Sequence, residues 1–274
     1  LEEPGDLFAC PSSLAPLTKV YRSYGPFVDK KYYINAQFAT KYDISRQYVD
    51  FTIAGTEKEQ ASAYGQFFFQ LPATSFIYER GYRQQFETVG FPGIDKEFAE
   101  IDEYFVSANA KTVLDLSCGS GFMTRRLLKS GNYDRVLDAD LSPSMLIETR
   151  SRCRQDTDIG KSRLPTLVRC DSAQLPFRSN SLDAIHAGAA MHCWPDLPTA
   201  VSEVYRVLKP NGGRYFATTF LSEYFSVLQQ SEGGESGPSR QAFQYFESVE
   251  QLRSLMESGG FEREKIHIEV LGTA

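Results

Sequence analysis

Glycines and carboxylates follow apolar runs at regular intervals in the second half of the chain. The run Val113–Leu116 leads into Ser-Cys-Gly-Ser-Gly, in which Gly119 and Gly121 flank one serine. Glycines in such a turn let a ligand press against bare backbone, where a Cβ would collide. Asp140 ends a second apolar run, 21 residues after Gly119. A carboxylate about 20 residues beyond a glycine turn accepts hydrogen bonds from a ribose diol.

Two more points continue this pattern. Asp171 follows a third apolar run, and its carboxylate can accept a hydrogen bond from an adenine amino group. A fourth run ends in the small residues Ala187–Ala190, over which a bulky group can lie. A GxG turn alone is a weak signal, and Asp140 alone could be the N-cap of the next helix. The ordered set of four is what predicts a ligand with ribose and adenine.

Strands and helices that alternate along the chain must bring these four points together. Such alternation predicts an α/β fold with a doubly wound, mostly parallel sheet and helices on both faces. The carboxyl ends of its strands then meet at one edge, where such sheets bind ligands. We expect strands at Thr112–Leu116, Arg135–Asp140, Thr166–Cys170, Leu182–Ala187 and Gly213–Thr219, and helices at Phe122–Ser130, Pro143–Cys153 and Leu197–Leu208.

The chain divides into three expected parts: a small β-rich flap over residues 1–55, a helical lid over residues 56–94 and the ligand-binding domain over residues 95–274. Asp95 is the expected N-cap of the first helix of that domain. We expect flap strands at Thr18–Tyr21, Lys31–Phe38 and Arg46–Phe51, helices at Glu57–Gln70, Ala73–Thr88, Asp95–Val106 and Ser248–Ser258, and a last strand at Lys265–Leu271.

Composition narrows the class of protein. The net charge of −6 argues against a dedicated nucleic-acid binder, which usually has a basic face. No apolar run approaches the roughly 20 residues of a membrane span. The chain begins at Leu1 without a methionine, which favours the removal of a targeting or expression segment. We therefore expect a soluble protein, with a monomer favoured.

The five cysteines are scattered and form no CxxC pair. This argues against a disulfide framework and favours a reducing compartment. The segment Cys10-Pro-Ser-Ser13 looks like half of a zinc ribbon, but Ser13 stands where a second thiolate belongs. Because structural zinc needs about four ligands, we expect a flap without a metal.

The four motifs together resemble the class I S-adenosylmethionine-dependent methyltransferases. The match covers about residues 95–271 and includes Val113–Gly121, Val136–Leu146, Cys170–Phe177 and Arg206–Gly213. Within that class the chain resembles the quinone-biosynthesis (UbiE-like) branch, and particularly its plant and algal chloroplast methyltransferase-like proteins. The closer likeness rests on Ser75–Arg83, Gly90–Gly93 and His186–Pro195. It implies a Rossmann-like sheet of the seven-stranded type and a place in the plastid.

The resemblance implies S-adenosylmethionine as cofactor and S-adenosylhomocysteine as product. The implied cofactor residues are Asp115, Ser117, Cys118, Gly119 and Gly121 at the methionine end, Asp140 and Leu141 at the ribose, Asp171, Ser172 and Ala173 at the adenine, and also Met145, Ala187 and Gly188. A dinucleotide site is the weaker alternative, because the third glycine position holds Thr124. Asp138 departs from the family pattern and is expected to add a negative charge near the ribose.

Methyl transfer from a sulfonium mainly needs alignment and exclusion of water. A base is needed only where the acceptor must lose a proton, and His192 is the candidate. Packing against Trp194 or capping of the next helix is its alternative role. His186 lies inside a strand and is expected to be a satisfied core residue, and Cys118 to serve in packing.

An aromatic acceptor pocket is expected from the flap, the lid helices and the loop Phe220–Gln241, so the predicted acceptor is a small, partly apolar molecule methylated on oxygen or carbon. Its expected residues are Tyr78, Tyr82, Arg83 and Trp194. A lid helix tied by a salt bridge is the alternative for the first three. The rival functions are an RNA base methyltransferase and a non-catalytic protein that binds S-adenosylmethionine.

Overall fold

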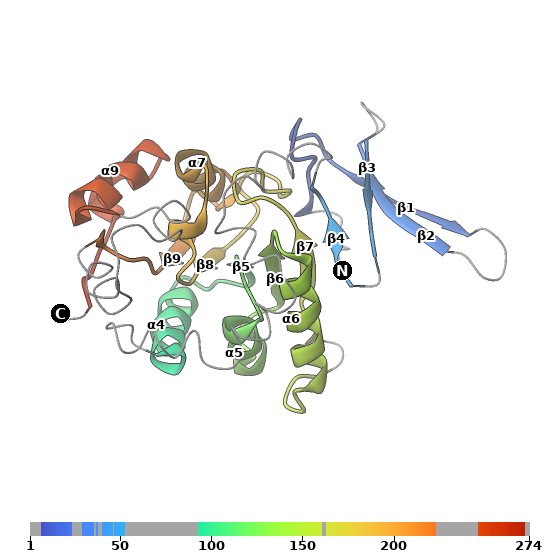
Figure 1. Cartoon of the computed structure of the whole chain (residues 1–274), viewed down its shortest axis with the longest axis horizontal. Coiled ribbons are helices and arrows are strands. Elements are labelled where there is room, and N and C mark those ends of the chain that lie inside the picture. The colour runs from blue at the N-terminus through green and yellow to red at the C-terminus, as the bar shows by residue number, and fades with distance from the viewer. Residues whose placement is uncertain are drawn as a thin grey trace, which may run out of the picture.

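A six-stranded sheet in the order β4-β7-β6-β5-β8-β9 forms the centre of the computed structural model (Figure 1). The structure describes residues 7–23, 29–35, 37, 40–45, 47–52, 93–160, 163–222 and 246–271. All described pairs of this sheet are parallel. Its strands are β4 (Val49–Asp50), β5 (Thr112–Leu116), β6 (Arg135–Asp140), β7 (Thr166–Arg169), β8 (Ala184–Ala187) and β9 (Arg214–Ala217). The expected parallel α/β sheet is therefore confirmed.

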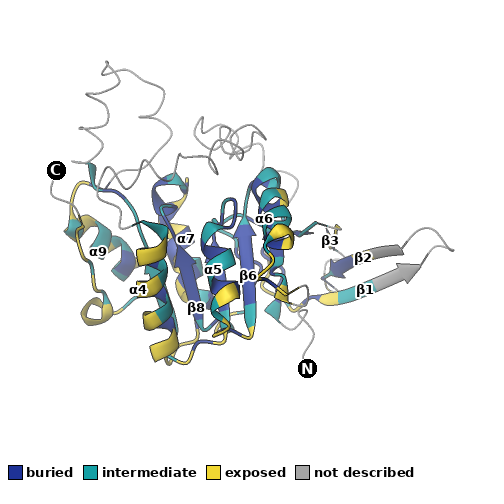
Figure 2. Cartoon of the chain, turned by 90° about the horizontal axis from the view of Figure 1, so that it is seen from below, coloured by how far each residue is buried: buried dark blue, intermediate teal, exposed yellow. Residues whose placement is uncertain are grey.

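Helices cover both faces of this sheet (Figure 1). One face carries α4, α5 and α6, and the other carries α7, with α9 packed beside it. Figure 2 shows β6 and β8 buried along most of their length, whereas the outer faces of α4 and α5 are exposed. These helices are α4 (Ile94–Ser107), α5 (Phe122–Ser130), α6 (Pro143–Gln155), α7 (Leu197–Val207) and α9 (Val249–Ser258).

Successive side chains of β5 point to opposite faces of the sheet, as the pleat requires. Leu114 and Leu116 join the core under α7, while Val113 joins the core under α4 and α5. Asp115 therefore faces α4 and α5. It lies opposite Asp138 of β6 on one side and His186 of β8 on the other. Three ionisable side chains thus form a row across one buried face of the sheet.

Serine side chains cap the starts of α6 and α9. The Ser248 side chain accepts a hydrogen bond from the Gln251 amide, and the Ser142 side chain accepts one from the Met145 amide. The prediction that Asp95 is an N-cap is wrong, because Gly93 holds that position with a φ of 75°. The carboxylate of Asp95 instead pairs with Arg126 of α5 at 2.6 Å.

A second, antiparallel sheet is formed by β1 (Thr18–Ser23), β2 (Asp29–Ile34) and β3 (Lys41–Asp43). We call it, together with residues 7–17 and 47–52, the flap. The strand expected at Arg46–Phe51 shrinks to β4 and belongs to the main sheet, where it runs parallel to β7. The flap therefore extends the main sheet at its β7 edge.

Aromatic packing fixes the flap on the main sheet. The Phe8 ring is fully buried and lies 5.1–5.6 Å, between ring centroids, from Tyr33, Phe51 and Phe177. A backbone bridge joins Phe8 to Phe177, which follows the loop after β7. This contact places the flap beside the Asp171 loop, three strands away from β8. The contribution of the flap to an acceptor pocket stays a prediction.

The last expected strand is wrong. Arg263–Lys265 form a 3₁₀ turn, and residues 266–271 are described without strand structure. Among the described residues no strand pairs with this alternating segment, and His267 and Glu269 are exposed. The expected lid helices Glu57–Gln70 and Ala73–Thr88 lie outside the described residues. Within the described part of the chain, no helix combines the length and the apolar character that a membrane crossing needs.

Replacing Phe8 with alanine tests whether the flap and the main sheet are one cooperative unit. The change removes a ring that is 0% exposed, so we expect the free energy of unfolding to fall by about 3–5 kcal/mol. Leu14→Ala is the matched control, because this flap side chain is 45% exposed and should cost less than about 0.5 kcal/mol. Denaturant unfolding followed at Trp194 measures both. An unchanged midpoint in Phe8→Ala would show that the flap folds separately.

Candidate functional site

The turn after β5 is held in an unusual backbone conformation. Ser117, Gly119 and Gly121 have φ values of 58°, 56° and 79°. Thr149 of α6 supports the turn, since its hydroxyl donates to the Gly119 carbonyl at 2.7 Å. A Cβ on Gly121 would lie 2.7 Å from the Thr149 methyl group. We call residues 117–121 the glycine loop, which leaves backbone rather than side chains at the end of β5.

Asp140 connects the glycine loop to the end of β6. Its Oδ2 accepts a hydrogen bond from the Gly119 amide at 2.9 Å, and its Oδ1 accepts one from the Ser142 amide at 2.8 Å. Burial outweighs these bonds and raises the pKa of Asp140 to about 6. Because Ser142 is the N-cap of α6, capping does not explain Asp140. Each carboxylate oxygen has a second lone pair, so Asp140 can still accept from a diol.

The ends of β6 and β7 lie side by side. The Cys170 amide donates to the Asp140 carbonyl at 3.3 Å, and the Asp171 side chain accepts from the Ala173 amide at 3.0 Å. Leu141 is fixed through its carbonyl, which accepts from Arg169 at 3.1 Å. Of the other predicted cofactor residues here, Met145 is 2% and Ser172 is 8% exposed. The second and third predicted points thus form one continuous stretch of the sheet edge.

The loop after β8 completes this edge. Ala187 is fully buried, and Ala189 has a φ of 50°, in the left-handed region that non-glycine residues rarely adopt. The Ala189 amide donates to the Thr218 hydroxyl at 2.9 Å. The Trp194 indole donates to the Ser117 hydroxyl at 3.0 Å, so this loop also contacts the glycine loop. We call residues 187–194 the β8 loop. All four predicted points therefore lie along one edge of the sheet.

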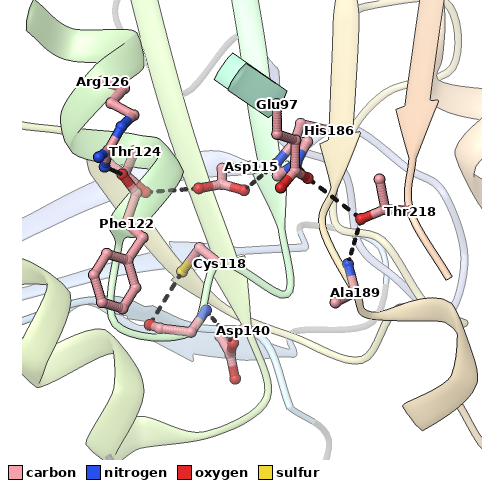
Figure 3. A network of polar contacts seen from close by, with 11 residues as sticks. Glu97, Asp115, Cys118, Phe122, Thr124, Arg126, Asp140, His186, Ala189 and Thr218 are labelled. Carbon is pink, nitrogen blue, oxygen red and sulfur yellow. Dashed lines mark hydrogen bonds and ion pairs between the residues drawn. The ribbon is translucent and has the colours of Figure 1, made fainter. Parts of the chain in front are cut away.

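A buried polar network lies directly beneath these loops (Figure 3). Asp115, only 1% exposed, accepts from the Thr124 hydroxyl at 2.8 Å through Oδ2 and pairs with His186 Nδ1 at 2.8 Å through Oδ1. The other ring nitrogen of His186 lies 3.3 Å from Glu97 Oε1. Burial alone would lower the pKa of His186, but its hydrogen bonds to Asp115 and Glu97 prevail and raise it to about 9. The ring is therefore an imidazolium at neutral pH.

The network occupies both oxygens of Asp115. One contacts Thr124 of α5 and the other His186 of β8, and the contact of Asp115 with the methionine end of the cofactor stays a prediction. The expectation that His186 is a satisfied core residue agrees with its two partners. Neither oxygen of Asp138 has a hydrogen-bond partner among the described residues. Burial and the neighbouring Asp115 charge hold the pKa of Asp138 well above its usual range. The extra negative charge near the ribose therefore stays a prediction.

His192 lies in a 3₁₀ turn, Met191–Cys193, within the β8 loop. Its ring is 5% exposed and packs edge-on against Phe220, with centroids 4.9 Å apart. Burial lowers the pKa of His192 to about 4, so the ring is neutral at pH 7. Burial raises the pKa of the Cys118 thiol, which fits a packing role. The catalytic role of His192 stays a prediction.

The predicted substrate residues Tyr78, Tyr82 and Arg83 lie outside the described residues. On the flap, the Cys10 sulfur lies 3.0 Å from the Tyr42 hydroxyl. Among the described residues, no group of three His, Cys, Asp or Glu side chains could hold a metal ion.

The sequence analysis missed three supporting residues: Glu97, Thr149 and Thr218. Glu97 lies on the inner face of α4, where a carboxylate at an otherwise apolar helix position was the available signal. Thr149 and Thr218 carry no such signal, because their roles depend on tertiary contacts with Gly119 and Ala189.

Comparisons with known proteins agree with this geometry. Residues 114–216 match the family model described as a methyltransferase domain. Two uncharacterized chloroplastic methyltransferases of Arabidopsis thaliana are 36% and 43% identical over 80% and 56% of this chain. The chain spans 63% and 43% of the lengths of these two relatives.

A solved structure shares the fold alone. The crystal structure of the [4+2]-cyclase SpnF has a TM-score of 0.50 and 24% identity, over 61% of this chain and 57% of that one. Since that protein is named as a cyclase, the shared fold does not by itself define a reaction.

Replacing Gly121 with alanine tests the geometry of the glycine loop. We expect a loss of about 2–4 kcal/mol in the free energy of unfolding, because a left-handed φ and a clash with Thr149 act together. Gly212→Ala is the control: its φ is 97°, but nothing lies within 4 Å of the new Cβ, so about 1–2 kcal/mol is expected. Thermal unfolding compares the two. Equal losses would contradict the contact between the loop and α6.

Proposed function

We propose that this chain is a class I, S-adenosylmethionine-dependent methyltransferase that methylates an oxygen or carbon atom of a small, partly apolar acceptor. Its residues 114–216 match the family model described as a methyltransferase domain. The observation that carries this proposal is the hydrogen bond between the Gly119 amide and Asp140. It joins a bare backbone turn to a carboxylate that has lone pairs left for a ribose diol.

The residues at the sheet edge fit S-adenosylmethionine in three parts. We assign the methionine end to the glycine loop, the ribose to Asp140 and Leu141, and the adenine to residues 171–173. Asp115 is assigned to the same methionine end, because each of its oxygens keeps a lone pair beside the contacts with Thr124 and His186. Met145, Ala187 and Gly188 are assigned to the walls around these contacts.

S-adenosylmethionine supplies an activated methyl group, so the protein must chiefly align the acceptor and keep water away. The β8 loop borders the glycine loop, which makes it the natural wall on the acceptor side. Within it, Trp194 is assigned to that wall. His192 is neutral at pH 7 and could accept a proton, and this role requires its ring to become accessible to the acceptor.

A second candidate is a protein that binds S-adenosylmethionine without transferring the methyl group. One observation favours it: burial holds the pKa of His192 at about 4, which makes this ring a weak base. No feature of the described residues favours the RNA base methyltransferase, so that alternative carries no proposal here.

The chloroplastic names of the two Arabidopsis thaliana relatives support a plastid location for this chain. We also propose that the chain divides at residues 55 and 94 and that it is a monomer. Tyr78, Tyr82 and Arg83 are proposed to bind the acceptor. The small acceptor is the proposed partner.

Methyl transfer itself is tested with isotope-labelled S-adenosylmethionine. The full chain is incubated with a plastid metabolite extract and, separately, with plastid RNA, and labelled products are separated by chromatography. Label in an apolar small molecule is the expected result. Label in RNA would support the rejected alternative, and binding without any labelled product would support the non-catalytic one.

Asp140→Asn tests the ribose assignment. We expect about 10- to 100-fold weaker binding of S-adenosylmethionine in calorimetry, because hydrogen bonds to a charged acceptor are lost. Asp134→Asn, at an exposed position before β6, is the control and should bind normally.

The pH dependence gives a second readout for Asp140. Because its pKa is raised to about 6, the carboxylate form that accepts best is lost as the pH falls through 6. We therefore expect the affinity of the unmodified protein to decline below pH 6 relative to Asp140→Asn. Parallel pH profiles would contradict a direct contact between Asp140 and the cofactor.

A further inference from the structure

The buried network beneath the sheet edge connects both sides of the proposed site. It begins at Thr124 in the first turn of α5, just after the glycine loop, and passes through Asp115, His186 and Glu97. It continues from Glu97 Oε1 to the Thr218 hydroxyl at 3.3 Å, which accepts from the Ala189 amide at 2.9 Å (Figure 3). One continuous chain of contacts thus links the cofactor side to the β8 loop.

His186 contributes a positive charge to this network. Asp115 and Glu97 are 1% and 2% exposed, and buried carboxylates are costly unless they are paired. His186, also 1% exposed, is the cation between them. If its ring loses the proton, two carboxylates face a neutral imidazole that can donate to only one of them.

Described residues of β5, α4 and β9 contact the His186 ring. Asp115 faces the ring from β5, Glu97 from α4, and Asp138 lies one strand further away in β6. Phe216 of β9 stacks against the ring with centroids 6.4 Å apart. Among the described residues that pack here, His186 is the only basic side chain in contact with these acids.

The network also accounts for a strained backbone. Ala189 has a φ of 50°, which a non-glycine residue keeps only where its surroundings hold it. Its amide is held by Thr218, and Thr218 contacts Glu97. The conformation of the β8 loop therefore depends on the position of the Glu97 carboxylate.

We propose that His186 is a positioning residue for methyl transfer. Through Asp115 and Glu97 it fixes the position of the glycine loop relative to the β8 loop. This inference rests on the proposed function, since it concerns how the cofactor side is aligned with the acceptor side. His186 touches neither ligand and acts through its two carboxylate partners. The two loops keep this relative position while the ring is an imidazolium, and they lose it when the ring becomes neutral.

His186→Gln and Glu97→Gln test this role, with His267→Gln and Glu100→Gln as matched controls at exposed positions. We expect about tenfold weaker binding of S-adenosylmethionine in calorimetry for the first two and no change for the controls. The pH profile separates positioning from mere stability. The raised pKa means that the imidazolium is fully present below pH 6.5 and is lost as the pH rises through about 9.

The affinity of the unmodified protein should therefore fall across pH 9 relative to that of His186→Gln, in which this step is absent. A lower melting temperature with unchanged affinity and an unchanged pH profile would reduce His186 to a structural role and overturn the inference. Failure of the unmodified protein to bind S-adenosylmethionine would instead overturn the proposed function.

A milder variant covers the case in which both charge variants fail to fold. Thr218→Val removes one hydroxyl, keeps the side-chain shape and cuts the link between Glu97 and Ala189. We expect about fivefold weaker cofactor binding, as for one lost hydrogen bond, and faster amide exchange at Ala189. Normal binding and normal exchange in this variant would contradict the coupling.

Discussion

Two carboxylates buried on either side of one imidazolium constrain the centre of this protein. Asp115, His186 and Glu97 come from β5, β8 and α4, and all three are almost fully buried. Buried charges need both a partner and satisfied hydrogen bonds, so these three elements can pack in few other ways. The strand register places Asp115 directly beside His186, and α4 must then present Glu97 to the remaining ring nitrogen. The positions of the glycine loop and the β8 loop therefore depend on how these three side chains pack.

The order of the parallel strands brings the four loops of the proposed site together. Because β7, β6, β5 and β8 are neighbours, four loops that are far apart in the chain end at one edge. The edge combines backbone amides of the glycine loop with the Asp140 carboxylate, and small residues follow β8. At the β7 end of this edge, the flap packs against the main sheet through Phe8 and β4, beside the loop after β7. It therefore supports the adenine side of the proposed site.

The sequence was sufficient for features that follow from local pattern and strand order. Apolar runs predicted the strands that end at Asp140 and Ala187, because parallel strands buried on both faces are continuously apolar. What it could not provide was tertiary pairing. Lys265–Leu271 alternates like a strand, but no described strand pairs with it. The burial that raises the pKa of Asp138 also depends on tertiary packing. The link from Glu97 to Ala189 also required the packed structure.

The central claim is that the carboxyl edge of β7, β6, β5 and β8 binds S-adenosylmethionine. A crystal structure of the full chain with S-adenosylhomocysteine tests it most directly. We expect the ribose hydroxyls within hydrogen-bond distance of Asp140, the adenine against residues 171–173 and the amino-acid end on the glycine loop. Electron density for the ligand at any other surface, or a ribose that does not contact Asp140, would contradict it.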